Sequence, residues 1–138
     1  MSKTENIKKI LYNNKEIAYI VRAQFPIDNL DFFSKKEDYL QVGYHKKPKG
    51  AKLKAHYHCF QKCSVDSLQE VFYIVKGKVK VNFYNKQGKL FQTEILKKGD
   101  ILFQRSLGHS FELLTQAEIF EVKQGPFLGS VQKKYYSL

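Results

Sequence analysis

Along most of the chain, apolar and polar residues alternate in short segments that are separated by turn-forming residues. Alternation with a period of two is typical of strands with one face in a core and the other in water. Near the N-terminus, Asn13-Asn14-Lys15 predicts a hairpin turn between two such segments. Together the segments predict strands over residues 9–12, 16–21, 39–45, 71–75, 79–84, 90–96, 101–103, 110–114 and 119–123.

Two neighbouring stretches interrupt this pattern. Phe25-Pro26-Ile27-Asp28 contains a proline that breaks the strand before it, and the amphipathic residues 30–33 favour one short helical turn. No segment has the apolar spacing of a long helix. Many short strands with regular turns predict an all-β fold, either a sandwich or a barrel.

The size and composition indicate one globular domain. The chain has 138 residues, of which 43% are hydrophobic, and no linker, repeat or low-complexity tract divides it. No apolar run approaches the roughly 18 residues that a membrane span needs. The stretch Met1–Asn6 is polar and has no apolar signal core behind it. We therefore expect a cytoplasmic protein without a membrane partner.

The net charge of +11, from 24 basic and 13 acidic residues, raises the question of a nucleic-acid partner. The lysines are spread along the whole chain and often alternate with apolar residues, as in residues 76–81. Arginine occurs only at positions 22 and 105, so there is no arginine-rich arm. We expect a solvated basic surface and no nucleic-acid partner. Such a surface could steer anionic small molecules, such as phosphorylated sugars, toward a pocket.

The two cysteines, Cys59 and Cys63, lie four positions apart. No second pair completes a four-cysteine zinc site, and a reducing compartment disfavours a disulfide between them. Ordinary thiols are the simpler interpretation, and a redox or ligand role is the alternative.

Four residues suggest a metal site. His56 and His58 form an H-x-H pair, and residues two apart in a strand point to the same face. Glu70 opens a predicted strand, and His109 follows Gly108 at the start of another. Three imidazoles and one carboxylate would suit a divalent transition metal such as Zn, Fe, Mn or Ni.

The spacing of these residues resembles the two sequence motifs of the cupin superfamily. Gly50, His56-Tyr57-His58, Glu70 and Gly77 resemble the first motif, and Gly99-Asp100-Ile101-Leu102-Phe103 followed by His109 resembles the second. The resemblance implies a small jelly-roll barrel whose mouth binds one metal ion through His56, His58, Glu70 and His109. Two features depart from the family pattern. Eleven residues separate His58 from Glu70, where Gln61, Asp66 or Gln69 could supply another ligand, and the second motif lacks its usual proline.

The resemblance is closest to an uncharacterised branch of small single-domain cupins, and it covers about residues 8–130. It rests on Gln69-Glu70, on residues 108–114 and on the ending Glu121-Val122-Lys123-Gln124-Gly125-Pro126-Phe127. Such proteins tend to accompany genes for surface polysaccharides and sugar nucleotides, which implies a carbohydrate-related ligand by association. We expect one domain over residues 1–138, with a hairpin and dimerisation arm over about 1–35 and a barrel over about 36–125.

Several residues near the expected metal are candidates for binding a substrate. By strand alternation Glu70, Phe72 and Ile74 should share the inward face. The candidates are His45, Gln61, Gln69, Gln104 and Arg105. The simpler interpretation of Gln104 and Arg105 is solvent exposure, and that of His45 is an exposed or internally hydrogen-bonded histidine.

These features support several functions. The first is a metal-dependent isomerase, epimerase or lyase-type enzyme acting on a small carbohydrate-related or anionic metabolite. The second is a non-catalytic module or sensor that binds a metal and a small molecule, and the third is a cupin-type dioxygenase. A metal-free sugar-nucleotide epimerase is a further alternative. Because the hairpin exposes strand edges, we expect a homodimer.

Overall fold

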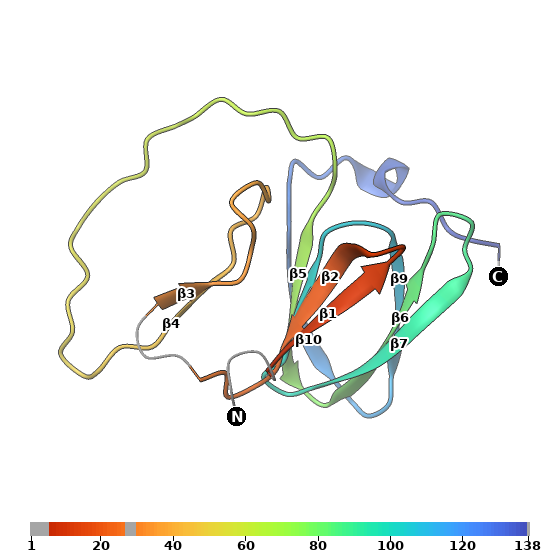
Figure 1. The fold of residues 1–138 in the computed structure, drawn as a ribbon, viewed down its shortest axis with the longest axis horizontal. Coiled ribbons are helices and arrows are strands. Elements are labelled where there is room, and N and C mark those ends of the chain that lie inside the picture. The colour runs from red at the N-terminus through yellow and green to blue at the C-terminus, as the bar shows by residue number, and fades with distance from the viewer. Residues whose placement is uncertain (1–5, 27–29, 138) are drawn as a thin grey trace.

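The computed structural model describes residues 6–26 and 30–137. Ten strands and one short 3-10 helix form in these residues, and we label them in chain order (Figure 1). The strands are β1 (Ile7–Tyr12), β2 (Lys15–Val21), β3 (Leu30–Phe32), β4 (Gly43–His45), β5 (Glu70–Lys76), β6 (Lys78–Tyr84), β7 (Leu90–Lys97), β8 (Ile101–Gln104), β9 (Gly108–Leu113) and β10 (Glu118–Lys123), and the helix is η2 (Gly129–Gln132). The expected all-β class is therefore confirmed.

Two antiparallel sheets make up the body of the molecule. The larger has the strand order β1-β2-β8-β5-β10, the smaller has the order β7-β6-β9, and neither closes into a barrel within the described residues. Strands β3 and β4 pair separately as a two-stranded sheet. The N-terminal hairpin is part of the larger sheet, because β2 pairs with β8. Asn13 and Asn14 have positive φ angles, as the tight turn between β1 and β2 requires.

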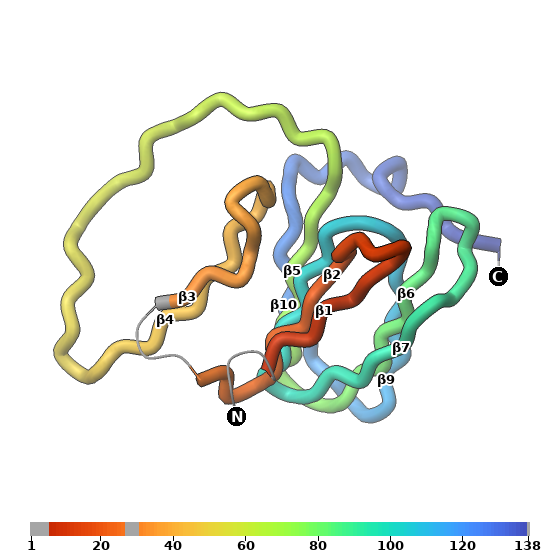
Figure 2. Tube along the Cα trace, viewed as in Figure 1, coloured from red at the N-terminus to blue at the C-terminus, as the bar shows by residue number. Residues whose placement is uncertain are grey.

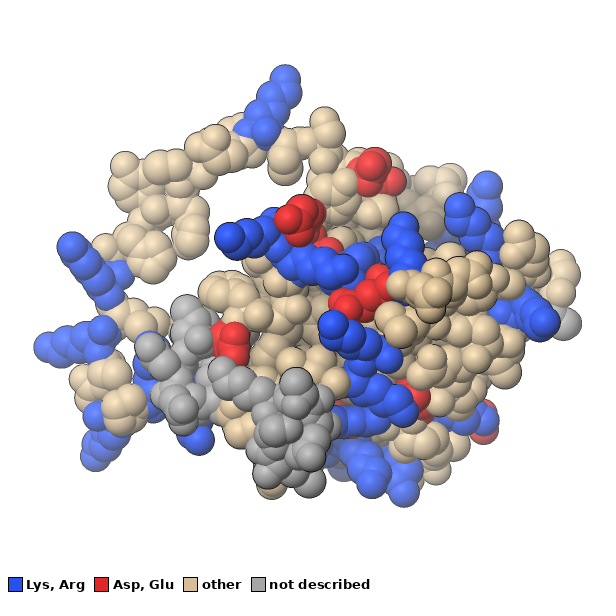
Figure 3. Space-filling model, viewed as in Figure 1, with Lys and Arg blue, Asp and Glu red and all other residues tan. Residues whose placement is uncertain are grey.

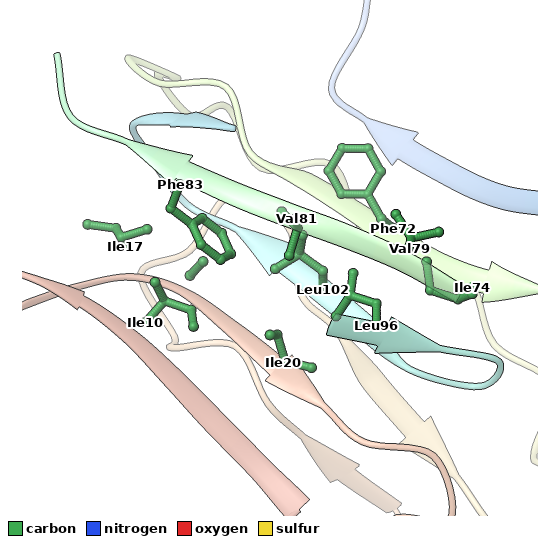
Figure 4. Close-up of a cluster of buried hydrophobic side chains, with 11 residues drawn as sticks. Ile10, Ile17, Ile20, Phe72, Ile74, Val79, Val81, Phe83, Leu96 and Leu102 are labelled. Carbon is green, nitrogen blue, oxygen red and sulfur yellow. The ribbon is translucent and has the colours of Figure 1, made fainter. Parts of the chain in front are cut away.

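The main core lies between the two sheets (Figure 4). Phe72 and Ile74 from β5 meet Val79, Val81 and Phe83 from β6, and all five are almost fully buried. Tyr73 and Val75, which alternate with them, are exposed on the outer face of the sheet. This confirms the predicted inward face of β5, and burying such side chains is the main source of stability in a small domain.

A second core covers the outer face of the larger sheet. Tyr19, Val21, Phe25 and Phe103 are buried there against partly buried side chains that include Phe33 and Leu40. Strand β2 is therefore covered on both faces, which explains why residues 17–21 are all apolar rather than alternating.

The structure differs from the predicted elements in two regions. Residues 30–32 form strand β3 instead of a helical turn, because they pair with β4. The strand predicted over residues 39–45 is shortened to Gly43–His45. Of the predicted breaker, Ile27 and Asp28 lie outside the described residues, as do residues 1–5 of the polar N-terminal stretch.

A long irregular segment, residues 46–69, joins β4 to β5. It contains no strand, and its residues 51–66 are exposed along their whole length. In the chain trace this segment forms a wide arc that leaves the body of the molecule and returns at β5 (Figure 2). Basic side chains, lysine or arginine, are visible both on this arc and across the face of the body (Figure 3), so the positive charge is not gathered into one patch on that face.

No helix in the described part of the chain is both long enough and apolar enough to cross a membrane.

Candidate functional site

Glu70 and His109 meet between the two sheets. Glu70 begins β5 in the larger sheet, and His109 is the second residue of β9 in the smaller one. Glu70 Oε2 lies 3.8 Å from His109 Nδ1, and the two side chains are only 14% and 19% exposed. The imidazole is held by edge-on contact with Phe72 and by a tilted contact with Phe111, each with ring centres 5.2 Å apart.

This pair lines a cavity of about 810 Å³. Its walls come from the inner faces of β5, β9 and β10 and from the segment that follows β10. The volume lies within the range of about 300–1,000 Å³ that is typical of small-molecule sites. Polar and charged groups line it beside aromatic ones: Glu121 and Lys123 from β10, Ser110 from β9 and Lys133 from the C-terminal segment.

Burial sets the protonation of both groups. It raises the pKa of Glu70 above its ordinary value, and the negative charge of Glu121 adds to this effect. Burial lowers the pKa of His109, and the positive charge of Lys133 lowers it further, although Glu121 opposes both. The cavity therefore favours the neutral forms of the two groups, because each would be costly to charge away from water.

The other two predicted ligands, His56 and His58, lie on the long segment between β4 and β5. Both are exposed, and their rings are 5.1 Å apart, centre to centre. The expectation that this H-x-H pair stands in a strand was wrong, because no strand forms there. Alternation keeps both rings on one side only where a partner strand fixes the backbone. His56 Nδ1 instead lies 2.8 Å from the carbonyl oxygen of Lys54.

The four predicted ligands are therefore present as two separate pairs. Within the described residues, no three His, Cys, Asp or Glu side chains stand close enough together to hold a metal ion. Cys59 and Cys63 are free and exposed on the same long segment as the loop histidines. The donor atoms suit a transition metal, but the backbone as folded does not bring the four residues into one coordination sphere.

The predicted substrate-binding residues take different positions, and none of the five lines the cavity. His45 in β4 and Gln61 on the long segment are exposed. Gln69 is buried, and its side chain accepts a hydrogen bond from the Leu40 backbone and donates one to Asp38. The expectation that Gln104 is solvent-exposed was wrong, because it is buried and donates to the Ser106 carbonyl oxygen.

Arg105 belongs to an internal ion-pair network. Its guanidinium donates to both carboxylate oxygens of Asp38, at 2.7 and 2.8 Å, and to Glu16 Oε1 at 3.0 Å. Burial alone would raise the pKa of Asp38, but the hydrogen bonds from Arg105 hold it below its ordinary value. The expectation that Arg105 is solvent-exposed was therefore wrong: its donors hold Asp38, which also accepts a hydrogen bond from the Lys35 backbone.

Strand β10 and the C-terminal segment also line the cavity, and neither was predicted to do so. Glu121 and Lys123 have the same strand parity as Ile119, which packs against the main core. That parity could have placed both charged residues on the inner side. No comparable pattern marks Lys133 or Tyr136, which lie beyond the last strand.

No known protein family, curated protein or solved structure matches this chain.

Proposed function

We propose that this is a cupin-type protein that binds a small carbohydrate-related or other anionic metabolite in the cavity between its sheets. The observation that carries the proposal is the meeting of Glu70 and His109 inside that cavity. They come from different sheets and are the two groups whose pKa values burial displaces there. Ionisable groups displaced in this way inside a cavity are typical of functional sites.

The chemistry that this pair supports is proton transfer. A protonated Glu70 can donate a proton, and a neutral His109 can accept one. Isomerases, epimerases and lyases need such groups beside a carbon next to a carbonyl. Phe72 and Phe111 hold the imidazole in place and keep water from one side of it. We therefore favour an isomerase, epimerase or lyase-type reaction over a purely passive binding role.

The ligand proposal can be tested by NMR. A panel of sugar phosphates and sugar nucleotides is added to the labelled protein, and shifts of the backbone amides of residues 108–111 are followed. A true ligand should shift these signals and raise the melting temperature. Glu70→Gln and His109→Asn should reduce both effects. The matched controls Glu118→Gln and His45→Asn make the same chemical changes at exposed positions and should retain them. If the control variants lost the amide shifts and the rise in melting temperature to the same extent, the cavity would not be the binding site.

A metal-bound state is a second form of the proposal, in which Glu70 and His109 act as ligands instead of as the proton donor and acceptor. His56 and His58 would supply two more ligands if the long segment moved toward the cavity. A bound divalent metal would polarise a substrate carbonyl. The test is elemental analysis of the purified protein, the double variant His56→Ala with His58→Ala, and the control His45→Ala. We expect one Zn, Fe, Mn or Ni ion per chain in the wild type and control. An unchanged metal content in the double variant would reject this ligand set.

We also propose a cytoplasmic homodimer. The free thiols of Cys59 and Cys63 suit a reducing compartment. Strands β1 and β10 lie at the two edges of the larger sheet, and each leaves backbone groups on one side without a strand partner in the described residues. Light scattering after gel filtration should give twice the chain mass of 16.2 kDa. A mass of one chain at micromolar concentration would reject the dimer.

A further inference from the structure

The chain after β10 forms one wall of the cavity. Residues 127–136 include η2, and eight of them line the same cavity as Glu70 and His109. In Figure 1 this segment runs from the end of β10 across the ends of the two sheets. The side chain of Gln132 links η2 to the preceding turn, accepting from the Leu128 backbone and donating to the Pro126 carbonyl oxygen.

Tyr136 fixes the far end of this segment to the smaller sheet. Its ring lies over Gly108 at the start of β9, where an added Cβ atom would overlap the ring. It also lies beside Gly88 in the turn between β6 and β7, and its ring centre is 5.7 Å from that of Tyr84. Two glycines therefore make room for this aromatic side chain. This packing of Tyr136 fixes the C-terminal wall of the cavity to the smaller sheet.

The charges that the segment brings to the cavity are unbalanced. Lys133 and Lys134 both line it, and neither has a side-chain hydrogen bond or ion pair to a described residue. Lys123, by contrast, is paired with Glu121 at 3.5 Å. Lys133 is near enough for its charge to act on both Glu70 and His109. The segment thus brings two exposed lysines, unpaired within the described residues, to the wall of the cavity, and the charge of Lys133 acts on the Glu70–His109 pair.

We propose that Lys133 and Lys134 bind the phosphate group of the ligand, so that the C-terminal segment selects a phosphate-bearing metabolite. This inference rests on the proposed function, because it places the phosphate in the same cavity as Glu70 and His109. Lysine ammonium groups bind phosphate as compact point charges. With the phosphate on this wall, the rest of the ligand extends toward the acid–base pair. Tyr136 acts as a positioning residue, because its packing against Gly108 and Tyr84 anchors the segment that carries the two lysines.

The experiment uses inorganic phosphate as the probe and follows the amide signals of residues 108–111 by NMR at low salt. We expect saturable shifts in the wild type. The double variant Lys133→Gln with Lys134→Gln should weaken the affinity about tenfold or more, equivalent to about 1.4 kcal/mol. The matched control is another exposed adjacent pair, Lys97→Gln with Lys98→Gln, which should stay within about twofold of the wild type because it lies outside this cavity.

Two further variants separate charge from structure. Lys133→Arg with Lys134→Arg keeps both charges and should restore phosphate binding. Tyr136→Ala keeps both lysines but releases their anchor, and should weaken binding severalfold. If the glutamine double variant binds phosphate as tightly as the wild type, or if phosphate produces no shift in the wild type, the inference is wrong. The proposed function is judged separately, by whether Glu70→Gln and His109→Asn reduce binding of the sugar panel.

Discussion

The two halves of the predicted ligand set lie in regions that differ in how the backbone is held. Glu70 and His109 stand on strands with hydrogen-bonded partners, and their positions follow from the registers of β5 with β8 and of β6 with β9. His56 and His58 stand on a segment with no strand partner in the described residues. A residue spacing therefore predicts a shared direction of side chains only where a sheet fixes the backbone.

The largest expected contrast is in stability. Phe72 is buried and contacts the imidazole of His109, so Phe72→Ala should lower the free energy of unfolding by about 3–5 kcal/mol. Tyr57, between the two loop histidines, is 86% exposed. Tyr57→Ala should therefore stay within about 0.5 kcal/mol of the wild type. Urea denaturation measures both. A loss above about 1 kcal/mol in Tyr57→Ala would mean that the long segment packs against the body.

A second contrast concerns proteolysis. Residues 46–62 contain six lysines in exposed, irregular backbone, whereas the lysines of β6 lie in paired strand. Trypsin should cut the long segment at least about tenfold faster than the strands, because cleavage there needs no unfolding of the sheet. Mass spectrometry of short digests identifies the first cuts. First cuts within β6 or β7 would contradict the contrast between the regions.

A third contrast concerns metal, which would bring the loop histidines to the cavity residues. If His56 and His58 approach Glu70 and His109 when Zn²⁺ is added, cleavage of the long segment by trypsin should slow severalfold. The Glu70→Gln variant should lose this protection, and His45→Ala should keep it. Equal protection in Glu70→Gln would show that the loop histidines bind metal without the cavity residues. The activity of trypsin itself is checked in parallel on an unrelated substrate with the same Zn²⁺ concentration.

The smallest expected effect is on pH dependence. The pKa of His109 lies below 6.5 in the folded state, so the unfolded chain binds more protons as the pH falls below that value. This extra proton binding lowers the free energy of unfolding as the pH falls. The loss is up to about 1.4 kcal/mol for each unit by which the folded pKa of His109 lies below its unfolded pKa. Glu70 acts in the opposite sense, because its raised pKa adds stability that is lost as the pH rises above 4.5.

Urea denaturation at pH 7.5 and 5.5 separates these contributions. In a Glu70→Gln background, the further change His109→Asn should remove the loss of stability between the two values. An unchanged pH dependence would mean that His109 is not buried as the structure places it.

The strands of the body could be predicted because their sequences carry both alternation and turn residues. Asn13 and Asn14 mark the first hairpin, and Gly77 marks the turn from β5 to β6, where it has a positive φ angle and the carbonyl oxygen of Gln116 leaves no room for a side chain. The meeting of Glu70 and His109 could be predicted only through the resemblance to cupins. The closed jelly-roll barrel that this resemblance implies stays a prediction.

The path of residues 46–69 could not be predicted, because His56-Tyr57-His58 has the spacing of a strand and nothing in the sequence reports whether a partner strand is present. The largely buried position of Arg105 could not be predicted for a different reason. Its position after β8 gives no sign of Asp38 and Glu16, which reach it from distant parts of the chain. Long-range contacts of this kind are set by tertiary packing rather than by local pattern.

The buried side chain of Gln69 has a consequence for how the chain tolerates changes in length. Gln69 ends the long segment and is held by Leu40, Asp38 and Gln124. The arc before it begins and ends at fixed points, so an inserted peptide there changes only the entropy of closing a loop. Each doubling of loop length costs about 0.6 kcal/mol. A tag or reporter peptide inserted near residue 52 should therefore leave the two-sheet body folded.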